Sequence, residues 1–295
     1  MRRRKTNADR TAGPEGQGAT GPAREEQRAP AAPAQTYRPG FEAVSPQGFA
    51  FMTLPDVSLI AGQVRSGGFA FTPSKQFRAF LTPEALAAWP SFAASWDHLG
   101  VDDYMADGGR YRRRRFAAFA ISQKGVVRKP HQPHYQSRDY NPLNGGVERW
   151  FEPVTEAISD HPVTLALLGA GRAVFDLSAP EKPREWHVET HQFRIEAREG
   201  QIGQPTPEGL HRDGVDFVLV VLIARTNVAS GITSIYDLDK TPLGDFTLTD
   251  PLDAVFLQDS RVYHGVTAIK PLDPAHVACR DVAVITFRDV DKPLI

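Results

Sequence analysis

The residues best placed to carry out chemistry lie in EGLHRDGVDFVLVVLIAR, residues 208–225. His211 and Asp213 are separated there by one residue, and an apolar run follows from Phe217 to Ala224. Side chains two positions apart on a strand point to the same face. An imidazole and a carboxylate would therefore face the same space at the edge of a buried strand. They form either a hydrogen-bonded pair or two of the three protein ligands of a metal ion.

A third group of suitable type is His264, within the strand-like run DAVFLQDSRVYHGVTAI. A histidine among apolar residues is more often a core residue than a ligand. With His211 and Asp213, however, it would complete a set of two histidines and one carboxylate, which holds non-haem ferrous iron and leaves positions open. Arg280 then begins the apolar run RDVAVITF. A guanidinium is costly there unless it meets an anion, and its planar fork matches a carboxylate.

The order of these groups resembles that of ferrous, 2-oxoglutarate-dependent oxygenases. More specifically, the chain resembles the small bacterial 2-oxoglutarate/iron dioxygenases that hydroxylate free L-amino acids, such as the isoleucine hydroxylases. The resemblance covers about residues 45–290 and is carried by the blocks DDYMADGGRYRRRRFAAF, PHYQSRDYNPLNGGVERWFEP, HQFRI, EGLHRDGVDFV, RTNVASGITSIYD, QDSRVYHGVTAI and RDVAVITF. One departure is NVASG, residues 227–231, where two adjacent glycines are expected. It is expected to affect a turn and not the chemistry.

The resemblance implies that His211, Asp213 and His264 bind Fe(II) and that Arg280 binds the distal carboxylate of 2-oxoglutarate. With O2, such an enzyme hydroxylates an unactivated C–H bond of a free L-amino acid or close derivative and releases succinate and CO2. Halogenating relatives lack the carboxylate that Asp213 supplies, so halogenation is not expected. Two alternatives stay open: an oxygenase acting on a carrier- or protein-bound residue, and a non-catalytic β-barrel binding module.

The substrate side is less defined. A free amino acid needs a cation for its carboxylate, and Arg149 and Arg194 are candidates, as are Arg113 and Arg115. Gln192 and Arg194 share one strand face, so either could reach 2-oxoglutarate or the substrate. We therefore expect the substrate-binding residues to include Arg149, Gln192 and Arg194.

Two other features have a plainer interpretation. The run RYRRRRF, residues 110–116, could suggest nucleic-acid binding, but a strand of alternating arginines partnered by acids such as Asp102 explains it better. The histidines outside the proposed ligand set have no metal-like spacing with it, and we expect them to be structural or at the surface. They are His131, His134, His161, His187, His191 and His276.

The elements that position these residues change character along the chain. In residues 82–99, Thr82 is a good N-cap, and Pro90 is expected to divide the segment into two short helices. Residues 145–171 are predicted to be helical, with a break at Pro153 or Pro162.

From about residue 184 onward, short β-branched or aromatic segments follow one another without intervening helices, which indicates an antiparallel sandwich or barrel of roughly seven or eight strands. The fold class is therefore α+β. The resemblance specifies a double-stranded β-helix (jelly-roll, cupin-like) core with N-terminal helices packed on it.

Composition limits the remaining possibilities. The chain has 295 residues, a formal net charge of −1 and a single cysteine, Cys279. These values predict no nucleic-acid partner, no disulfide framework and a cytoplasmic location. No apolar run is long enough to span a membrane. Residues 1–40 are rich in Ala, Pro, Gly, Gln, Glu and Arg and are predicted to form a disordered tail, followed by a single domain over residues 41–295. The oligomeric state stays open.

Overall fold

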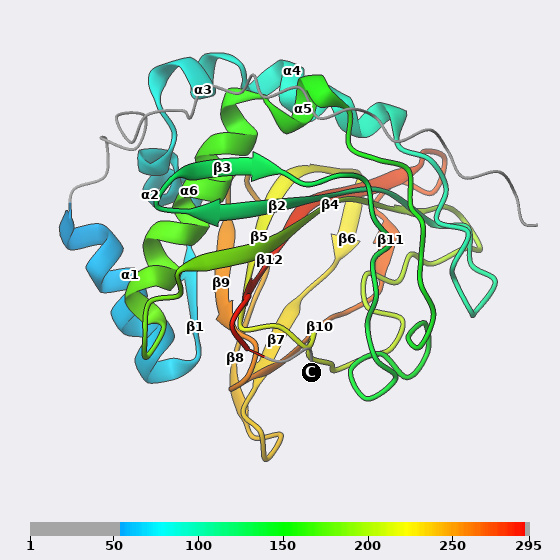
Figure 1. Cartoon of the computed structure of the whole chain (residues 1–295). Helices are drawn as coiled ribbons and strands as arrows, with labels where there is room; N and C mark the ends of the chain where they lie inside the picture. The colour runs from blue at the N-terminus through cyan, green and yellow to red at the C-terminus, as the bar shows by residue number, and fades with distance from the viewer. Residues whose placement is uncertain (1–53, 293–295) are drawn as a thin grey trace, which may run out of the picture. The chain divides into compact units, whose positions relative to one another are not determined.

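The computed structural model describes residues 54–292 (Figure 1). All of the proposed tail, residues 1–40, and the boundary at residue 41 lie outside the described residues, so both stay predictions. Within residues 54–292, no helix is both long enough and apolar enough to cross a membrane.

The first half of the chain supplies most of the helices. These are α1 (Leu54–Gly67), α2 (Ser74–Phe77), α3 (Pro83–Ala87), α4 (Trp89–Ala94), α5 (Glu156–Ser159) and α6 (Pro162–Ser178), with short 3₁₀ turns at Arg78–Phe80 and Ser95–His98. Thr82 caps α3 as expected, because its Oγ1 accepts a hydrogen bond from the backbone N–H of Ala85 at 3.1 Å. The expected division near Pro90 is also confirmed, since α3 and α4 are separate helices.

The helix predicted over residues 145–171 begins later than expected. Residues 145–155 are not helical, and only α5 and α6 form on either side of the break at Pro162. The backbone of the first part is used elsewhere. Phe116 N–H donates to Glu152 O and Val154 N–H donates to Phe116 O, both at 2.9 Å. These bonds hold the segment extended against a strand, so its backbone cannot form a helix.

Antiparallel strands build the core. A seven-stranded sheet has the order β1 (Phe69–Thr72), β9 (Ala254–Gln258), β5 (Phe217–Thr226), β12 (Ala278–Asp289), β4 (Glu185–Ala197), β2 (Arg112–Ser122) and β3 (Gly125–Arg128). A smaller sheet has the order β10 (Tyr263–Val266), β7 (Thr233–Tyr236) and β8 (Pro242–Phe246), and β11 (Ile269–Pro271) pairs with β6 (Val228–Ser230). The fold is a double-stranded β-helix with helices packed on it, as expected. Its twelve strands between residues 54 and 292 exceed the roughly seven or eight predicted. Three of them, β1, β2 and β3, come earlier in the chain than the predicted strand region, and that region itself holds nine.

The large sheet presents a different environment on each face. In Figure 1, α1 and α6 lie side by side against one end of it. On that side Phe175 of α6 packs against Phe217 and Phe287, with ring centroids 4.7 and 5.0 Å apart. Gly171 permits this approach, since a Cβ there would lie 2.5 Å from the Phe287 ring. Alternate residues of β12 point to the opposite face, where they line a cavity.

Candidate metal and co-substrate site

A cavity of about 660 Å³ is lined by strands of both sheets and by the loops at their ends. Its volume is typical of small-molecule sites. His211, Asp213 and His264 all line it, and so does Arg280 from β12. The four residues that the sequence pattern singled out are therefore brought to one cavity, although they come from separate parts of the chain.

His211 and His264 are held opposite each other by the backbone. Each donates its backbone N–H to the other's carbonyl oxygen at 3.0 Å, and their ring centroids are 4.4 Å apart. Asp213 completes the group, with one carboxylate oxygen 3.5 Å from His264 Nε2 and the other 3.8 Å from His211 Nε2. The potential ligand atoms of the three residues all lie within 4.8 Å of one another.

The turn that carries Asp213 is anchored by a buried carboxylate, Asp259. Its two oxygens accept backbone N–H bonds from Asp213 and Gly214 at 2.8 Å and from Val215 at 3.2 Å. Gly214 has a φ of 79°, and a Cβ there would lie 2.8 Å from the Tyr140 ring. The local sequence RDGV therefore forms a turn in which glycine is the residue best suited to position 214.

The protonation of the two imidazoles suits metal binding. His211 Nδ1 lies 3.1 Å from Gly209 O and donates to it, which leaves the Nε2 lone pair free. Burial, reinforced by His211, lowers the pKa of His264 to about 4, so its imidazole is neutral at pH 7. Burial also disfavours a charged His211, but Asp213 and Glu208 outweigh it and raise the pKa of His211. A cation could take the place of that proton. Two imidazole nitrogens and a carboxylate in a partly open set fit Fe(II).

Arg280 is a buried cation facing the same cavity. It is 3% exposed, and its Nε has no hydrogen-bond partner among residues 54–292. Burial, with Arg225 nearby, lowers the pKa of Arg280 to about 10, so the guanidinium stays charged at neutral pH. A buried guanidinium that forms no ion pair within the described chain requires an anion from outside. A ligand carboxylate would satisfy it bidentately.

The expected substrate-binding residues are not brought together. Arg149 is 1% exposed and lines the cavity. Gln192 and Arg194 do not, because they occupy the opposite face of β4. Gln192 donates to Ser95 Oγ at 2.8 Å, and Arg194 pairs with Asp281 at 2.7 Å. Gln192 and Arg194 do share a face, as expected, but that face is turned away from the cavity.

The arginine run behaves as an alternating strand. Arg113 and Arg115 lie on the outer face of β2 beside Glu196 and Glu152. Arg112 and Arg114 instead line the cavity and share the buried carboxylate of Asp102, at 2.7 and 3.6 Å. The expected pairing with Asp102 is thus confirmed. The sequence predicted that the arginines alternate between the two faces of the strand. It did not predict which of these faces is turned toward the cavity.

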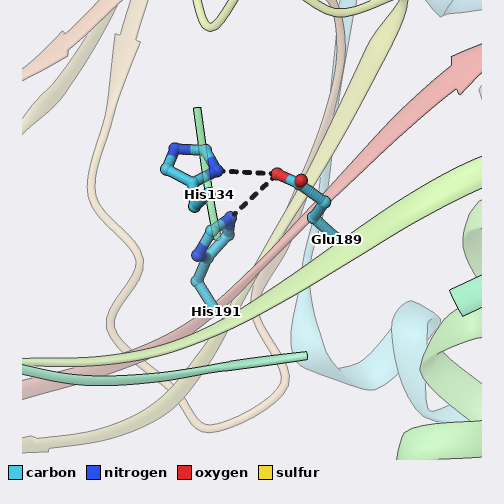
Figure 2. Close-up of side chains that lie close together, drawn as sticks. All are labelled: His134, Glu189 and His191. Carbon is cyan, nitrogen blue, oxygen red and sulfur yellow. Dashed lines mark hydrogen bonds and ion pairs between the residues drawn. The ribbon is translucent and has the colours of Figure 1, made fainter. Parts of the chain in front are cut away.

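A second histidine cluster in this cavity went unnoticed in the sequence. Figure 2 shows His134 and His191 directed toward the carboxylate of Glu189, with His134 Nδ1 at 2.8 Å and His191 Nε2 at 3.8 Å from Oε2. His187 Nε2 lies 3.3 Å from the other oxygen. The three histidines are therefore not surface residues. The only sequence signal was that His187, Glu189 and His191 alternate along one strand.

The donor pattern makes this cluster a hydrogen-bond network. Arg114 Nη2 lies 2.6 Å from His191 Nδ1, and a guanidinium only donates, so Nδ1 accepts and Nε2 carries the proton. Lys129 Nζ fixes His187 in the same way at 2.8 Å. The Nε2 atoms of His191 and His187 therefore carry protons and face Glu189. A metal ion bound there would need lone pairs on these nitrogens instead. These imidazoles hold the pKa of Glu189 well below its usual range against the effect of burial.

Comparison with known proteins agrees with this fold. The model of the 2OG-Fe dioxygenase family matches residues 93–286, more than half of the chain. The chain therefore belongs to the 2OG-Fe dioxygenase family and is a dioxygenase that uses Fe(II), 2-oxoglutarate and O2.

Several relatives are similar over most of their length. The 3(1)-hydroxy-L-isoleucine 4-dioxygenase of Pantoea ananatis is 25% identical, with 75% of this chain and 92% of that protein covered. The L-isoleucine-4-hydroxylase of Bacillus thuringiensis is 24% identical, with 66% and 81% covered. The crystal structure of a bsmA homolog from Methylobium petroleophilum PM1 is 35% identical, with a TM-score of 0.72 and 81% and 96% covered.

Proposed function

We propose that the protein hydroxylates an unactivated C–H bond of a free L-amino acid, with Fe(II) held by His211, Asp213 and His264. The observation that carries the proposal is that these three residues line the same cavity as Arg280, which forms no ion pair with the described residues 54–292. In this assignment Arg280 binds the C5 carboxylate of 2-oxoglutarate.

The substrate class is supported by two relatives whose names state activity on isoleucine or hydroxyisoleucine. It is also supported by the cavity, since about 660 Å³ suits a small ligand lying beside 2-oxoglutarate. A carrier- or protein-bound residue would instead need a groove that leads its chain out of the site.

The chain's own residues contribute binding and orientation. Arg280 would fix the far end of 2-oxoglutarate, and Val220, Val282 and Val284 give the cavity an apolar wall that excludes water. When bound, ferrous iron uses O2 and 2-oxoglutarate to convert a substrate C–H bond into C–OH, with succinate and CO2 as the other products. Asp259 would keep the Asp213 turn in place throughout.

A screen for succinate release tests this function. Full-length protein with Fe(II), 2-oxoglutarate and O2 is incubated with each of the twenty amino acids and common non-proteinogenic ones. At least one should stimulate succinate formation well above the rate without substrate, together with an equimolar hydroxylated product. The same reaction with His264→Ala should give neither. Stimulation only by peptides or carrier-bound residues would refute the proposal for free amino acids.

A further inference from the structure

Two charged side chains of opposite sign face the cavity without a matching partner. Arg149 is 1% exposed, and its one side-chain hydrogen bond among residues 54–292 runs from Nη2 to Gln136 Oε1 at 3.2 Å. Its Nε has no partner, and no carboxylate of the described chain forms an ion pair with it. Leaving a guanidinium buried in this way is costly unless an anion from outside completes the site.

Glu208 is the opposite case, a buried carboxylate with one oxygen that has no hydrogen-bond donor in the described part of the chain. Its side chain is 8% exposed, Oε1 lies 3.5 Å from His211 Nε2, and Oε2 has no hydrogen-bond partner in the described part of the chain. Because Glu208 precedes His211 by three residues, its carboxylate lies beside the proposed metal ligands. Burial, with Arg112 nearby, lowers the pKa of Arg149, whereas Asp102, Glu208 and Glu189 act against that shift. Arg149 and Glu208 line the same cavity without forming an ion pair with each other.

We propose that Arg149 and Glu208 are the two poles of the amino acid subsite, with Arg149 binding the α-carboxylate and Glu208 binding the α-ammonium group. This inference rests on the proposed function, in which the substrate is a free amino acid. A zwitterion between them would satisfy both buried charges at once. An amine-free acid would leave Glu208 unpaired, and an amino acid amide would leave Arg149 unpaired.

The other buried charged groups of the cavity have partners or another proposed role, and Arg288, which is only half-buried, contacts the backbone oxygen of Asp289. Arg114 lies between two aromatic rings, 3.6 Å from the Phe151 centroid and 4.4 Å from that of Phe193, and it contacts Asp102 and His191. Glu189 accepts hydrogen bonds from imidazoles on both oxygens, as Figure 2 shows for one of them. Arg280 is needed for 2-oxoglutarate. Among the buried groups of the cavity, Arg149 forms no ion pair with the described residues, and Glu208 contacts only His211, a proposed metal ligand.

The backbone holds Arg149 firmly in position. It forms a two-residue antiparallel bridge with His134, with N–H to O distances of 2.9 and 3.0 Å in the two directions. His134 in turn contacts Glu189 of β4. The loop that carries Arg149 is thus connected through His134 to β4, which forms a wall of the cavity. A guanidinium held in this way can orient a carboxylate with little loss of freedom on binding.

Binding measured without turnover tests the assignment. The Co(II) and 2-oxoglutarate complex is titrated with the amino acid that performs best in the succinate screen, and with its des-amino acid and its amide. For L-isoleucine these are 3-methylpentanoate and L-isoleucinamide. The wild-type complex should prefer the amino acid to either analogue by at least about 100-fold, because a buried polar group loses its partner in each mismatch.

Each variant should lose one preference and keep the other. Glu208→Gln should bind the amino acid and the des-amino acid with similar affinity but still reject the amide. Arg149→Gln should do the reverse, and Arg149→Lys, which keeps the charge, should recover part of the preference. Binding of Co(II) and 2-oxoglutarate, measured first, should persist in each variant and show that the site is folded. Glu148→Gln, which removes an exposed acid at the cavity rim, is the matched control and should retain both preferences.

The outcomes separate this inference from the proposed function. If wild-type protein binds an amino acid and Glu208→Gln keeps the full preference over the des-amino acid, the inference is wrong and the proposed function stands. Loss of that preference in Glu189→Gln instead would place the ammonium group at the histidine cluster and also overturn it. If Co(II) and 2-oxoglutarate bind but no amino acid does, both the proposed function and the inference fail.

Discussion

His211 and His264 form a single antiparallel bridge in which each backbone N–H donates to the other's carbonyl oxygen at 3.0 Å. The bridge joins the loop before β5 to β10 of the smaller sheet. Two imidazoles from distant parts of the chain are thereby held in register before any ion binds. This preorganisation favours tight metal binding, because little ordering remains to be done when the ion arrives.

Replacing any one of the proposed ligands should abolish metal binding at this site. His211→Ala, Asp213→Ala and His264→Ala should each lose the one Co(II) per chain expected for wild-type protein, together with all succinate formation. Circular dichroism should show that the fold persists. Full activity in any of the three would remove that residue from the ligand set. A second Co(II), lost in His134→Ala, would contradict the hydrogen-bond assignment of the Glu189 cluster.

Asp259 should control metal affinity from outside the ligand set. Asp259→Asn places an amide NH2 group against the backbone N–H of either Asp213 or Gly214, which should loosen the turn and weaken Co(II) binding by about 10- to 100-fold. Asp253 is a matched control, since it also accepts three backbone N–H bonds but does not line the cavity. Asp253→Asn should lower the melting temperature and leave Co(II) affinity unchanged. Equal effects of both variants on Co(II) would refute this role.

Arg280 should determine the requirement for 2-oxoglutarate. Arg280→Ala would leave the C5 carboxylate unpaired in a buried site, at a cost of about 2–5 kcal/mol in binding, which is about a thirty- to several-thousand-fold weaker affinity. Arg280→Lys keeps the charge but loses the fork, so it should retain some turnover at raised 2-oxoglutarate. Titration of 2-oxoglutarate at saturating amino acid measures both. A change in amino acid affinity alone would assign the anchor to another arginine, with Arg288, which also lines the cavity, the first candidate.

Asp102 should contribute stability that depends on pH. Burial alone would raise its pKa, but Arg114 and Arg112 outweigh burial and lower it below its ordinary value of 3.8. The stabilisation is therefore fully present above about pH 4 and is lost as pH falls through the lower folded-state pKa. Asp102→Asn should cost about 3–5 kcal/mol at pH 7. Urea unfolding at several pH values measures the difference in free energy of unfolding between wild type and variant. This difference should become smaller toward pH 3, and a difference that does not depend on pH would contradict this account.

The turn at NVASG should be under backbone strain. Ser230 has a φ of 65° and Gly231 a φ of 79°, so a non-glycine residue occupies one of two consecutive left-handed positions. Ser230→Gly should be neutral or stabilising by up to about 1 kcal/mol, whereas Gly231→Ala should destabilise by about 1–2 kcal/mol. A Cβ at Gly231 would also lie 3.1 Å from Arg225 Nη1. Urea unfolding measures the free energy of unfolding of both variants, and Ser230→Gly should be the more stable of the two. If Gly231→Ala were the more stable, the turn would have to relax without strain.

Residue types and their spacing were sufficient for part of the site. The set of His211, Asp213 and His264, followed by Arg280, could be proposed because local pattern and chain order carry that information. The N-cap at Thr82 and the break at Pro162 were also predictable, because capping and proline geometry depend on a few neighbouring residues. The first part of the helical segment predicted over residues 145–171 was not formed, since backbone pairing of Glu152 and Val154 with Phe116 competes with it.

The sequence by itself determined which residues share a face of a strand, and tertiary structure decided which face looks into the cavity. Alternation placed Gln192 with Arg194 correctly, yet it is Glu189 and His191 on the other face that line the site. Alternation along a strand shows which residues share a face, but it does not show which face is turned toward the cavity. That depends on how the sheet packs against its neighbours. The same holds for Arg149 and Glu208, which lie far apart in the chain. Their opposite charges face one cavity only because the fold closes loops over it.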